Sequence, residues 1–219
     1  MIYLATSPLP PGLIYHLGRS LYVSLTNTSV GLPLLLSRGP SFVMPESSNF
    51  SKLPDGYSPK PDQIVSAVNQ LWTSDEFDDT GVTFAGAGDP LLELDTLISS
   101  ANLLKSTNPS KSLTFRVNTN GLFLSPSSLA SSLSSASITQ VTVALNYATP
   151  SEYDSNMSPP EPTSFKTVCE FIEAFVEHDG IDKVTATCVD NGRVDVERVR
   201  SFAVDDLGVD EFKVRTYFG

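Results

Sequence analysis

The chain has 219 residues, with 14 lysines and arginines against 25 aspartates and glutamates, so its formal net charge is −11. This acidic balance argues against non-specific binding of nucleic acid and of anionic membranes. A hydrophobic fraction of 40% with only 18% charged residues excludes disorder over the whole chain, and the length predicts a single domain, residues 1–219.

The start of the chain carries no targeting pattern. Residues 1–11 contain no lysine or arginine and three prolines, so we expect no cleaved secretory signal. The longest apolar run near the start, residues 30–36, is interrupted by Pro33 and is far shorter than the roughly 20 residues that span a bilayer. We therefore expect a soluble, cytoplasmic protein that does not bind membranes.

Short β-rich runs then alternate with longer segments of helical period, a pattern typical of parallel strands joined by right-handed crossovers. We predict six strands, at residues 21–25, 82–84, 113–117, 140–145, 183–189 and 211–215. The helices predicted between them are residues 62–71, 90–104, 127–133, 164–176 and 194–204. Val, Leu, Phe and Thr dominate the strands, so we expect helices or loops to cover both faces of the sheet. This α/β order fits either an open doubly wound sheet or a partial barrel.

Residues 26–61, between the first strand and the first helix, form a long segment without a clear period. It is rich in Ser, Pro and Gly, and loops of this length are usually functional or disordered. In either sheet arrangement a ligand is expected beyond the carboxyl ends of the strands, where this segment begins.

The second strand ends in Gly86-Ala87-Gly88-Asp89-Pro90. Small residues between a strand and a helix let a ligand approach backbone groups, so this segment is a candidate ligand loop, with a plain tight turn as the alternative. It is not a dinucleotide fingerprint, because Leu91 stands where the third glycine would be.

The third and fourth strands also end in polar residues. Asn118-Thr119-Asn120-Gly121 follows the third strand and is either a strand-ending turn or part of a site, and Asn146 follows the fourth. Because the carboxyl ends of parallel strands meet at one edge of a sheet, these segments and the glycine-rich loop could face one cavity.

The other reactive residue types are given structural interpretations. Cys169 and Cys188 have no partner pair and are expected to be buried thiols, and His16 and His178 surface or capping residues. The acids of residues 205–206 and 210–211 are expected on a solvated face, and no metal site is predicted. Arg116 and Arg215 could pair with buried acids or hold an anionic ligand, and Arg38 in the long loop could hold an anionic ligand.

Several motifs in fixed order resemble the radical S-adenosylmethionine (radical SAM) superfamily, and most closely its TatD-associated branch. They cover nearly the whole chain, and they are Leu21-Tyr22-Val23-Ser24-Leu25-Thr26-Asn27, Arg38-Gly39-Pro40-Ser41-Phe42-Val43-Met44-Pro45, Val82-Thr83-Phe84-Ala85-Gly86-Ala87-Gly88-Asp89-Pro90-Leu91-Leu92, Arg116-Val117-Asn118-Thr119-Asn120-Gly121-Leu122 and Val143-Ala144-Leu145-Asn146. The resemblance implies a partial (β/α)6 TIM-like barrel.

In that superfamily the loop after the first strand carries C-x-x-x-C-x-x-C, three thiolates that hold a [4Fe–4S] cluster. Here the three positions are Ser29, Pro33 and Leu36, and no cysteine precedes Cys169. Because neither proline nor leucine offers a ligand to iron, we expect that the cluster is not formed and that the usual radical chemistry is lost.

The resemblance also implies roles for the organic half of the site. It places Gly86, Ala87, Gly88 and Asp89, at the superfamily's G-G-E-P position, against the amino group of the methionine moiety, and Asn146 near the ribose. Asn118 and Asn120 join this predicted cofactor-binding set. Without the cluster as an anchor, any affinity for S-adenosylmethionine should be much weaker.

Four interpretations stay open. The favoured one is a pseudoenzyme, a degenerate barrel that binds a small molecule or a protein partner. The second is an enzyme of altered, cluster-independent chemistry that uses S-adenosylmethionine or a nucleotide. The third is an active radical enzyme whose cluster ligands come from Cys169, Cys188 or a partner chain. The fourth is an error in the sequence around residues 29–36.

Overall fold

A computed structural model describes residues 10–219 of the chain. The first nine residues, which hold most of the segment where no secretory signal is expected, lie outside the described part. Among residues 10–219 no helix combines the length and the apolar character needed to cross a membrane.

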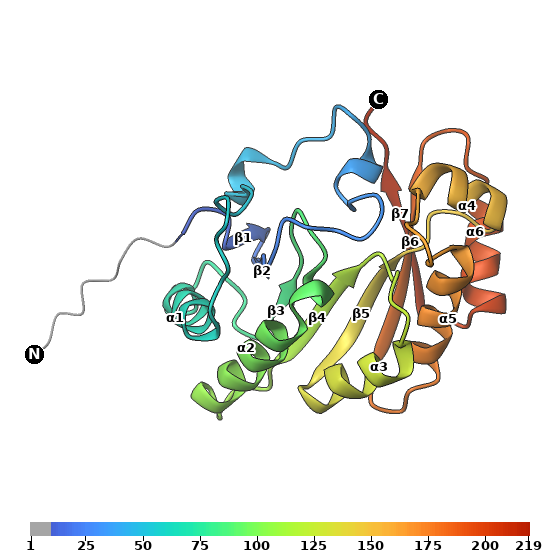
Figure 1. Cartoon of the computed structure of the whole chain (residues 1–219). Helices are drawn as coiled ribbons and strands as arrows, with labels where there is room; N and C mark the ends of the chain where they lie inside the picture. Colours follow the sequence, from blue (N-terminus) through green and yellow to red (C-terminus); the bar gives the residue numbers. More distant parts are fainter. Residues whose placement is uncertain (1–9) are drawn as a thin grey trace, which may run out of the picture.

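A seven-stranded, curved sheet forms the centre of the molecule and has the shape of a half-barrel (Figure 1). Its strands follow one another in space in the order of the sequence. They are β1 (Ile14–Leu17), β2 (Ser20–Val23), β3 (Gly81–Phe84), β4 (Thr114–Thr119), β5 (Ile138–Ala144), β6 (Lys183–Asp190) and β7 (Glu211–Thr216). Each pair from β2 to β7 is parallel, as the alternation of strand and helix patterns predicts.

The number of strands differs from the six predicted, because β1 pairs with β2 in an antiparallel hairpin. The turn between them consists of Gly18 and Arg19, and Gly18 has φ +60°, which glycine adopts at no steric cost. A two-residue turn with a glycine, between two runs containing Tyr and Leu, is a hairpin signal that the prediction overlooked.

Six α-helices connect or follow the strands. They are α1 (Pro61–Leu71), α2 (Leu94–Thr107), α3 (Pro126–Ser135), α4 (Pro150–Met157), α5 (Phe165–Val176) and α6 (Val196–Ser201). Helix α4 was not predicted, because only Tyr153 and Met157 are buried on it and so its sequence shows little periodicity. The predicted helix 90–104 begins as a 3-10 turn, Pro90–Glu93, and the predicted helix 194–204 continues past α6 as a π-helical turn, Phe202–Asp206.

The two faces of the sheet differ in chemistry. Residues such as Phe115, Val117 and Val143 are fully buried and belong to the hydrophobic core shared with the helices. The residues that alternate with them along the strands face the other side of the sheet and are mostly polar: Thr83, Arg116, Asn118, Gln140, Thr142, Thr187 and Arg215. Several of these polar residues line cavities on the inner, concave face. Helices cover only the outer face, and the loop of residues 26–61 covers part of the inner one.

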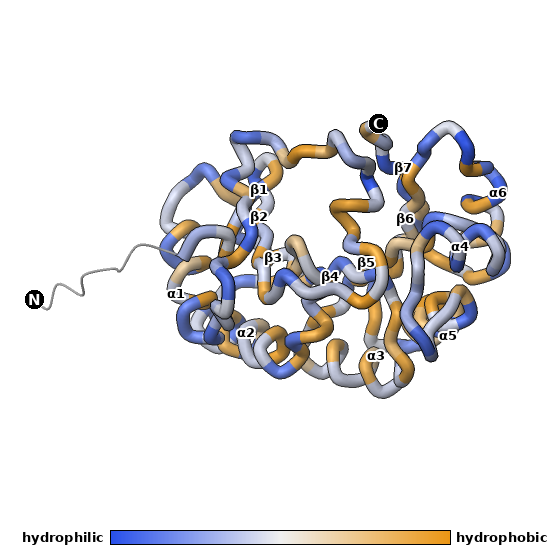
Figure 2. Tube along the Cα trace, turned by 45° about the horizontal axis from the view of Figure 1, so that its top comes forward, coloured by the Kyte–Doolittle hydropathy of each residue, from blue (hydrophilic) through white to orange (hydrophobic). Residues whose placement is uncertain are grey.

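This difference follows from the connections. When consecutive parallel strands are neighbours throughout, right-handed crossovers put every helix on the same side of the sheet. The helices therefore bury one face of the sheet, and no helix layer remains for the other. Figure 2 shows hydrophobic segments along both the strands and the helices. The alternation of Thr114-Phe115-Arg116-Val117 in β4 is the period-2 pattern that such a sheet requires.

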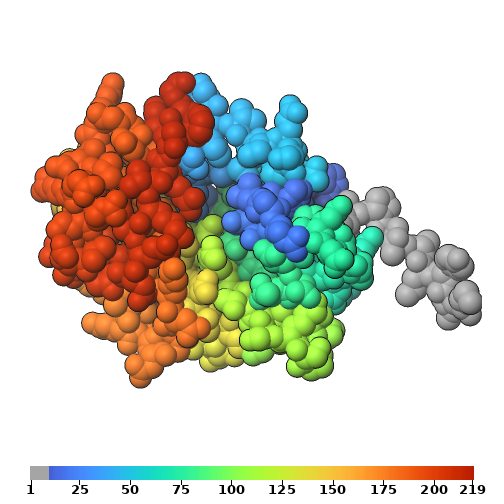
Figure 3. Space-filling model, turned by 180° about the vertical axis from the view of Figure 1, so that it is seen from behind, coloured from blue at the N-terminus to red at the C-terminus, as the bar shows by residue number. Residues whose placement is uncertain are grey.

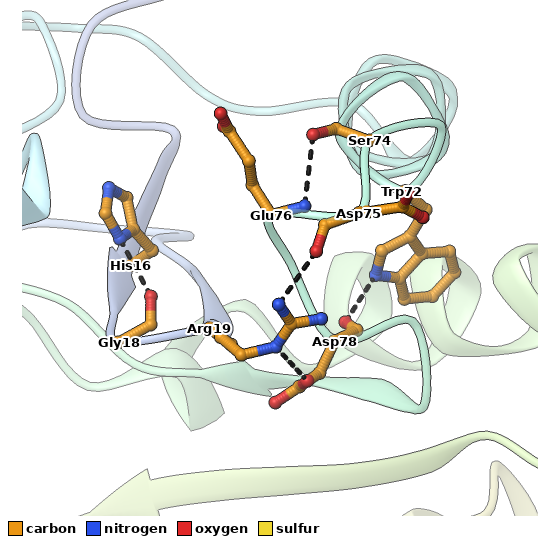
Figure 4. A network of polar contacts seen from close by, with 8 residues as sticks. All are labelled: His16, Gly18, Arg19, Trp72, Ser74, Asp75, Glu76 and Asp78. Atoms are coloured by element: carbon orange, nitrogen blue, oxygen red, sulfur yellow. Dashed lines mark hydrogen bonds and ion pairs between the residues drawn. The ribbon is translucent and has the colours of Figure 1, made fainter.

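Polar contacts fix the hairpin to the connection between α1 and β3 (Figure 4). Arg19 donates from Nε to Asp78 Oδ1 at 2.9 Å and from Nη1 to the Asp75 carbonyl at 2.8 Å. Trp72 donates from Nε1 to the Asp78 carbonyl at 3.0 Å, so one short segment holds both the hairpin and the end of α1. The hairpin therefore forms a fixed wall at one side of the concave face.

Candidate functional site

A cavity of about 140 Å³ lies on the concave face, at the carboxyl ends of the parallel strands. Its walls come from three parts of the chain: the β1–β2 hairpin, the segment of residues 34–44, and the ends of β3 to β7. The lining residues include Tyr15, Tyr22, Arg38, Phe42, Gly86, Asn118, Asn146 and Arg215. Its place beyond the strand ends is where an α/β sheet of this topology is expected to bind ligands.

The loop of residues 26–61 crosses over these strand ends and contacts β7 (Figure 1). The Arg38 carbonyl accepts a hydrogen bond from the Phe218 backbone N–H at 2.8 Å, and the Ser41 N–H donates to the Phe218 carbonyl at 3.2 Å. The Gly39 backbone packs so closely on Phe218 that a Cβ atom at Gly39 would overlap the Phe218 carbonyl oxygen. Backbone pairing thus holds the loop against the far edge of the sheet, across from the hairpin, and Figure 3 shows from behind the hollow between these two sides.

Arg38 occupies the wall that this pairing forms. Its guanidinium carbon lies 4.5 Å from the centre of the Phe42 ring and 5.5 Å from that of Phe218, and its Nε donates to the Thr216 carbonyl at 2.8 Å. Burial lowers the pKa of Arg38, and the positive charge of Arg215 lowers it further. A guanidinium remains protonated despite such a shift, so the cavity wall carries a fixed positive charge.

Arg215 lies on β7 and lines the same cavity. The basic residue two positions before it, Lys213, is neutralised by Glu211 at 2.9 Å, and Glu211 also pairs with Lys183 at 2.8 Å. These two lysines hold the pKa of Glu211 down at about 2. Among residues 10–219 neither Arg38 nor Arg215 has a carboxylate within 4.0 Å.

An aromatic pair forms the opposite wall. The rings of Tyr15 and Tyr22 stack with centroids 5.0 Å apart and an interplanar angle of 23°. Phe50 contacts the Tyr15 ring edge-on at 5.0 Å and so fixes its orientation. Burial raises the pKa of Tyr15 above its usual range, so the phenol stays neutral and the wall is uncharged.

Asn118 lines the cavity and carries an unsatisfied polar atom. It is the fifth residue of β4, on the concave side, and its Oδ1 is buried without a hydrogen-bond partner among the described residues. Most buried polar side-chain atoms in native proteins have a partner, so an orphaned acceptor in a cavity points to a donor that a ligand or a water supplies.

Asp89 lies beside the cavity but is enclosed by its own chain. Its Oδ2 accepts hydrogen bonds from Thr119 Oγ1 at 2.7 Å and from the Asn120 N–H at 2.9 Å, and its Oδ1 caps the following turn by accepting from the Leu91 N–H at 3.1 Å. Only 1% of its surface is exposed. Burial raises the pKa of this carboxyl to about 6, against the three hydrogen bonds, which lower it.

The loop after β2 covers the glycine-rich segment. The Gly88 N–H donates to the Thr26 carbonyl at 3.1 Å, and the Asp89 N–H donates to the Thr28 carbonyl at 2.8 Å. A Cβ atom at Gly88 would overlap the Thr28 carbonyl oxygen and lie 2.6 Å from the Asn27 carbonyl carbon. Glycine is therefore required at position 88 for contact with the chain's own loop.

Asn120 and Asn146 have mainly structural partners. Asn120 Nδ2 donates to the Val30 carbonyl, and its Oδ1 accepts from the Leu122 N–H at 3.2 Å. Asn146, at φ +59°, accepts from the Val189 N–H at 3.0 Å and so ties the end of β5 to β6. Both residues therefore close turns at the strand ends.

The predicted cofactor-binding residues thus separate into two groups. Gly86, Asn118 and Asn146 line the cavity, whereas Ala87, Gly88, Asp89 and Asn120 do not. Gly88, Asp89 and Asn120 contact residues 26–30 and 119–122 instead. Sequence reasoning missed the wall formed by Tyr15 and Tyr22, because it had not recognised the hairpin. Pairing of Tyr15 with Tyr22 in a two-residue hairpin is the signal that would have found it.

The residues of the loop after β2 do not fit an iron–sulfur cluster. Ser29 Oγ lies 3.4 Å from Asn120 Nδ2, Pro33 presents a ring without a donor atom, and the Leu36 side chain is 63% exposed. A [4Fe–4S] cluster is held by thiolates, and this loop offers none. Among residues 10–219 no group of three His, Cys, Asp or Glu side chains is placed to hold a metal ion.

The two cysteines lie elsewhere. Cys169 is on α5 and is partly buried, and Cys188 is on β6, fully buried, with its Sγ donating to the Asn146 carbonyl at 3.3 Å. Burial first, and nearby carboxylates second, raise the pKa of each thiol to about 12. Neither cysteine lines the cavity.

The two histidines and Arg116 make contacts typical of structural residues. His16 Nδ1 lies 3.1 Å from the Gly18 carbonyl oxygen, and His178 Nδ1 accepts from the Gly180 N–H at 3.0 Å, which is a capping contact. Arg116 reaches Gln140 Oε1 at 3.3 Å and lines a separate cavity near the amino ends of the strands.

No protein-family model and no curated protein matches the sequence. Among solved structures, SuiB from Streptococcus suis superposes with a TM-score of 0.60 at 13% identity, over 92% of this chain and 41% of that one. The superposition shows that the two proteins share a fold over most of this chain. The chain therefore corresponds to less than half the length of SuiB.

A weaker likeness is found to the catalytic domain of a hyperthermophilic chitinase from Pyrococcus furiosus. Its TM-score is 0.42 at 14% identity, over 74% of this chain and 59% of that one. A second chitinase structure from the same organism gives a TM-score of 0.40 at 13% identity, with the same coverage. These scores are too low to bear on the fold.

Proposed function

We propose that this chain is a degenerate radical SAM-like half-barrel that works without a [4Fe–4S] cluster and binds a small molecule in the cavity at its strand ends. The observation that carries the proposal is that Asn118, whose Oδ1 has no hydrogen-bond partner among residues 10–219, lines a cavity beside a loop without thiolates. An unsatisfied acceptor at the carboxyl ends of the strands, where this fold binds ligands, is explained better by a bound molecule than by a purely structural role. The assignment to the TatD-associated branch rests on the sequence motifs alone.

The size of the cavity limits the ligand. About 140 Å³ is available, close to the roughly 150 Å³ cavity that accommodates a benzene molecule and below the roughly 300–1,000 Å³ of drug-sized sites. The ligand that fits is thus of single-ring size. Asp89 is only 1% exposed and accepts three hydrogen bonds from its own chain, so the amino group of S-adenosylmethionine has no access to it.

A screen of single-ring fragments by thermal shift and saturation-transfer NMR tests this proposal. It should include neutral, anionic and cationic fragments, and it should compare the wild-type protein with Asn118→Leu, which keeps the branched outline of the side chain and removes the amide. We expect hits that stabilise the wild type and are lost in the variant. A screen without hits that depend on Asn118 would contradict small-molecule binding in this cavity and would favour a protein partner instead.

A second candidate function is cluster-independent chemistry on S-adenosylmethionine or a nucleotide. A second cavity, of about 230 Å³, shares Ser37, Asn146 and Val189 with the first, so a longer ligand could extend through both past the residue that the resemblance places near the ribose. Calorimetric titration of S-adenosylmethionine into protein of measured iron content separates the candidates. One-to-one binding of S-adenosylmethionine to iron-free protein, with displacement of the fragment hits, would favour cluster-independent chemistry. No heat of binding at millimolar S-adenosylmethionine would favour the single-ring ligand.

A further inference from the structure

Two guanidinium groups from opposite ends of the chain meet in one cavity. Arg38 comes from the loop after β2, Arg215 from the last strand, and both line the cavity. The chain as a whole has a net charge of −11, yet no carboxylate of residues 10–219 neutralises either group. Six of the other twelve basic residues form ion pairs with acids, as Lys183 and Lys213 do with Glu211.

Keeping two like charges close without a counter-ion is unfavourable. The backbone pairing of residues 38 and 41 with Phe218 nevertheless holds Arg38 next to the end of β7. Arg38 uses its Nε on the Thr216 carbonyl, and its two terminal nitrogens have no hydrogen-bond partner among the described residues. These terminal nitrogens are thus free to donate to an anion in the planar, forked geometry that suits carboxylates and phosphates.

The rest of the cavity defines what the anion is attached to. The Tyr15 and Tyr22 rings offer a flat, uncharged wall, and the volume of about 140 Å³ leaves room for one ring. Asn118 Oδ1 needs a donor and cannot obtain one from the surrounding chain. A complementary ligand therefore combines an oxyanion, a single planar ring and a hydroxyl or amino group.

We propose that Arg38 and Arg215 form a clamp for a single-ring oxyanion, a carboxylate or a phosphate ester, whose hydrogen-bond donor is accepted by Asn118. The proposal rests on the proposed function, because it names the ligand class of the same cavity. It adds that the anionic group, rather than the ring alone, determines recognition.

Calorimetric titration with 4-hydroxybenzoate, 4-hydroxyphenyl phosphate and the uncharged 4-hydroxybenzamide tests the clamp. The variant is Arg215→Gln, since Arg215 is exposed and has no hydrogen bond or ion pair to residues 10–219 whose loss would unfold the protein. The matched control is Arg198→Gln, which removes the same charge from an exposed position of α6 outside the cavity. A further variant, Arg215→Lys, keeps the positive charge and loses the forked donor geometry of the guanidinium.

At least one of the two anions should bind wild type and the Arg198→Gln control equally. Arg215→Gln should weaken that binding by roughly 10- to 100-fold, the range for losing one charged hydrogen bond, and Arg215→Lys should weaken it less. The amide should bind at least about tenfold more weakly than the better anion. Which anion binds more tightly identifies the group as a carboxylate or a phosphate.

Equal affinity for the amide and the anions, or equal effects of Arg215→Gln and Arg198→Gln, would overturn the clamp while leaving small-molecule binding intact. Absence of binding by both anions would also overturn it. The proposed function is judged separately by neutral and cationic fragments whose binding depends on Asn118, so the two failures are distinguishable.

Discussion

At the scale of the residue, Asp89 combines complete burial with three hydrogen bonds from its own chain. The resemblance places it against a ligand amino group, whereas the structure uses both of its oxygens to join Thr119, Asn120 and Leu91. Burial dominates its titration, because the pKa is raised to about 6 even though every hydrogen bond favours the charged form.

This shift gives a pH-dependent stability of definite sign. A carboxyl titrates near pH 4 in the unfolded chain and at about 6 in the folded one, so between these values the folded state binds more protons and stability falls as pH rises. Relative to Asp89→Asn, which cannot ionise, the wild type should lose up to about 3 kcal/mol of unfolding free energy between pH 4 and 6. Urea titrations of both proteins across this range measure the difference, and a pH-independent difference would contradict the shifted pKa.

Asn118 shows the opposite situation, a polar atom for which the chain provides no partner. An unsatisfied buried acceptor costs stability, and replacing it with an apolar group of the same shape removes the cost. We expect Asn118→Leu to raise the free energy of unfolding by about 1 kcal/mol while abolishing fragment binding. Thermal unfolding without ligand measures the first effect. A destabilised variant would indicate that Asn118 serves the fold rather than a ligand.

At the scale of the element, the glycine-rich segment between β3 and α2 is a packing surface for the loop after β2. Its sequence is equally compatible with a ligand loop and with a tight turn, and no local pattern distinguishes them, because the loop that covers it lies about 60 residues earlier in the chain. In the structure, the backbone N–H groups of Gly88 and Asp89 donate to Thr26 and Thr28, so these two residues contact the chain's own loop.

Gly88→Ala tests this contact. The new Cβ would overlap the backbone of Thr28, which cannot move away as a side chain can, so we expect a loss of about 3 kcal/mol of stability. Gly192→Ala is the control: nothing lies within 4 Å of its Cβ position and its φ is +74°, so only the conformational cost of about 1 kcal/mol applies. Equal losses in chemical denaturation would show that residues 26–28 do not pack on Gly88.

The elements themselves could be predicted from the sequence to a large extent. All six parallel strands and five of the six α-helices follow from periodicity, because hydrophobic residues at period 2 or 3.6 are the same residues that face the core. The helix α4 was missed because it buries only two side chains and so shows little periodicity. The strand β1 was missed because the two-residue turn at Gly18 and Arg19 was not recognised as a hairpin signal. The polar inner face was visible in the alternation of β4 but was outweighed by the number of β-branched residues.

At the scale of the whole molecule, the site depends on contacts that no local pattern contains. Gly86, Asn118 and Asn146 could be predicted to share a cavity because parallel strands end at one edge. The meeting of Arg38 with Arg215, across 177 positions of sequence, arises only from the curvature of the sheet and from the pairing of the loop with Phe218. The stacked tyrosines depend in the same way on the hairpin.

The central proposal is that this half-barrel acts without an iron–sulfur cluster, because Ser29, Pro33 and Leu36 stand where the resemblance to the radical SAM superfamily leads us to expect the three cysteines. The most direct measurement is anaerobic reconstitution with iron and sulfide, followed by determination of bound iron and of S-adenosylmethionine cleavage under reducing conditions. We predict no stoichiometric iron and no cleavage above the level without protein. Formation of a cluster on the chain together with reductive cleavage of S-adenosylmethionine would contradict this account.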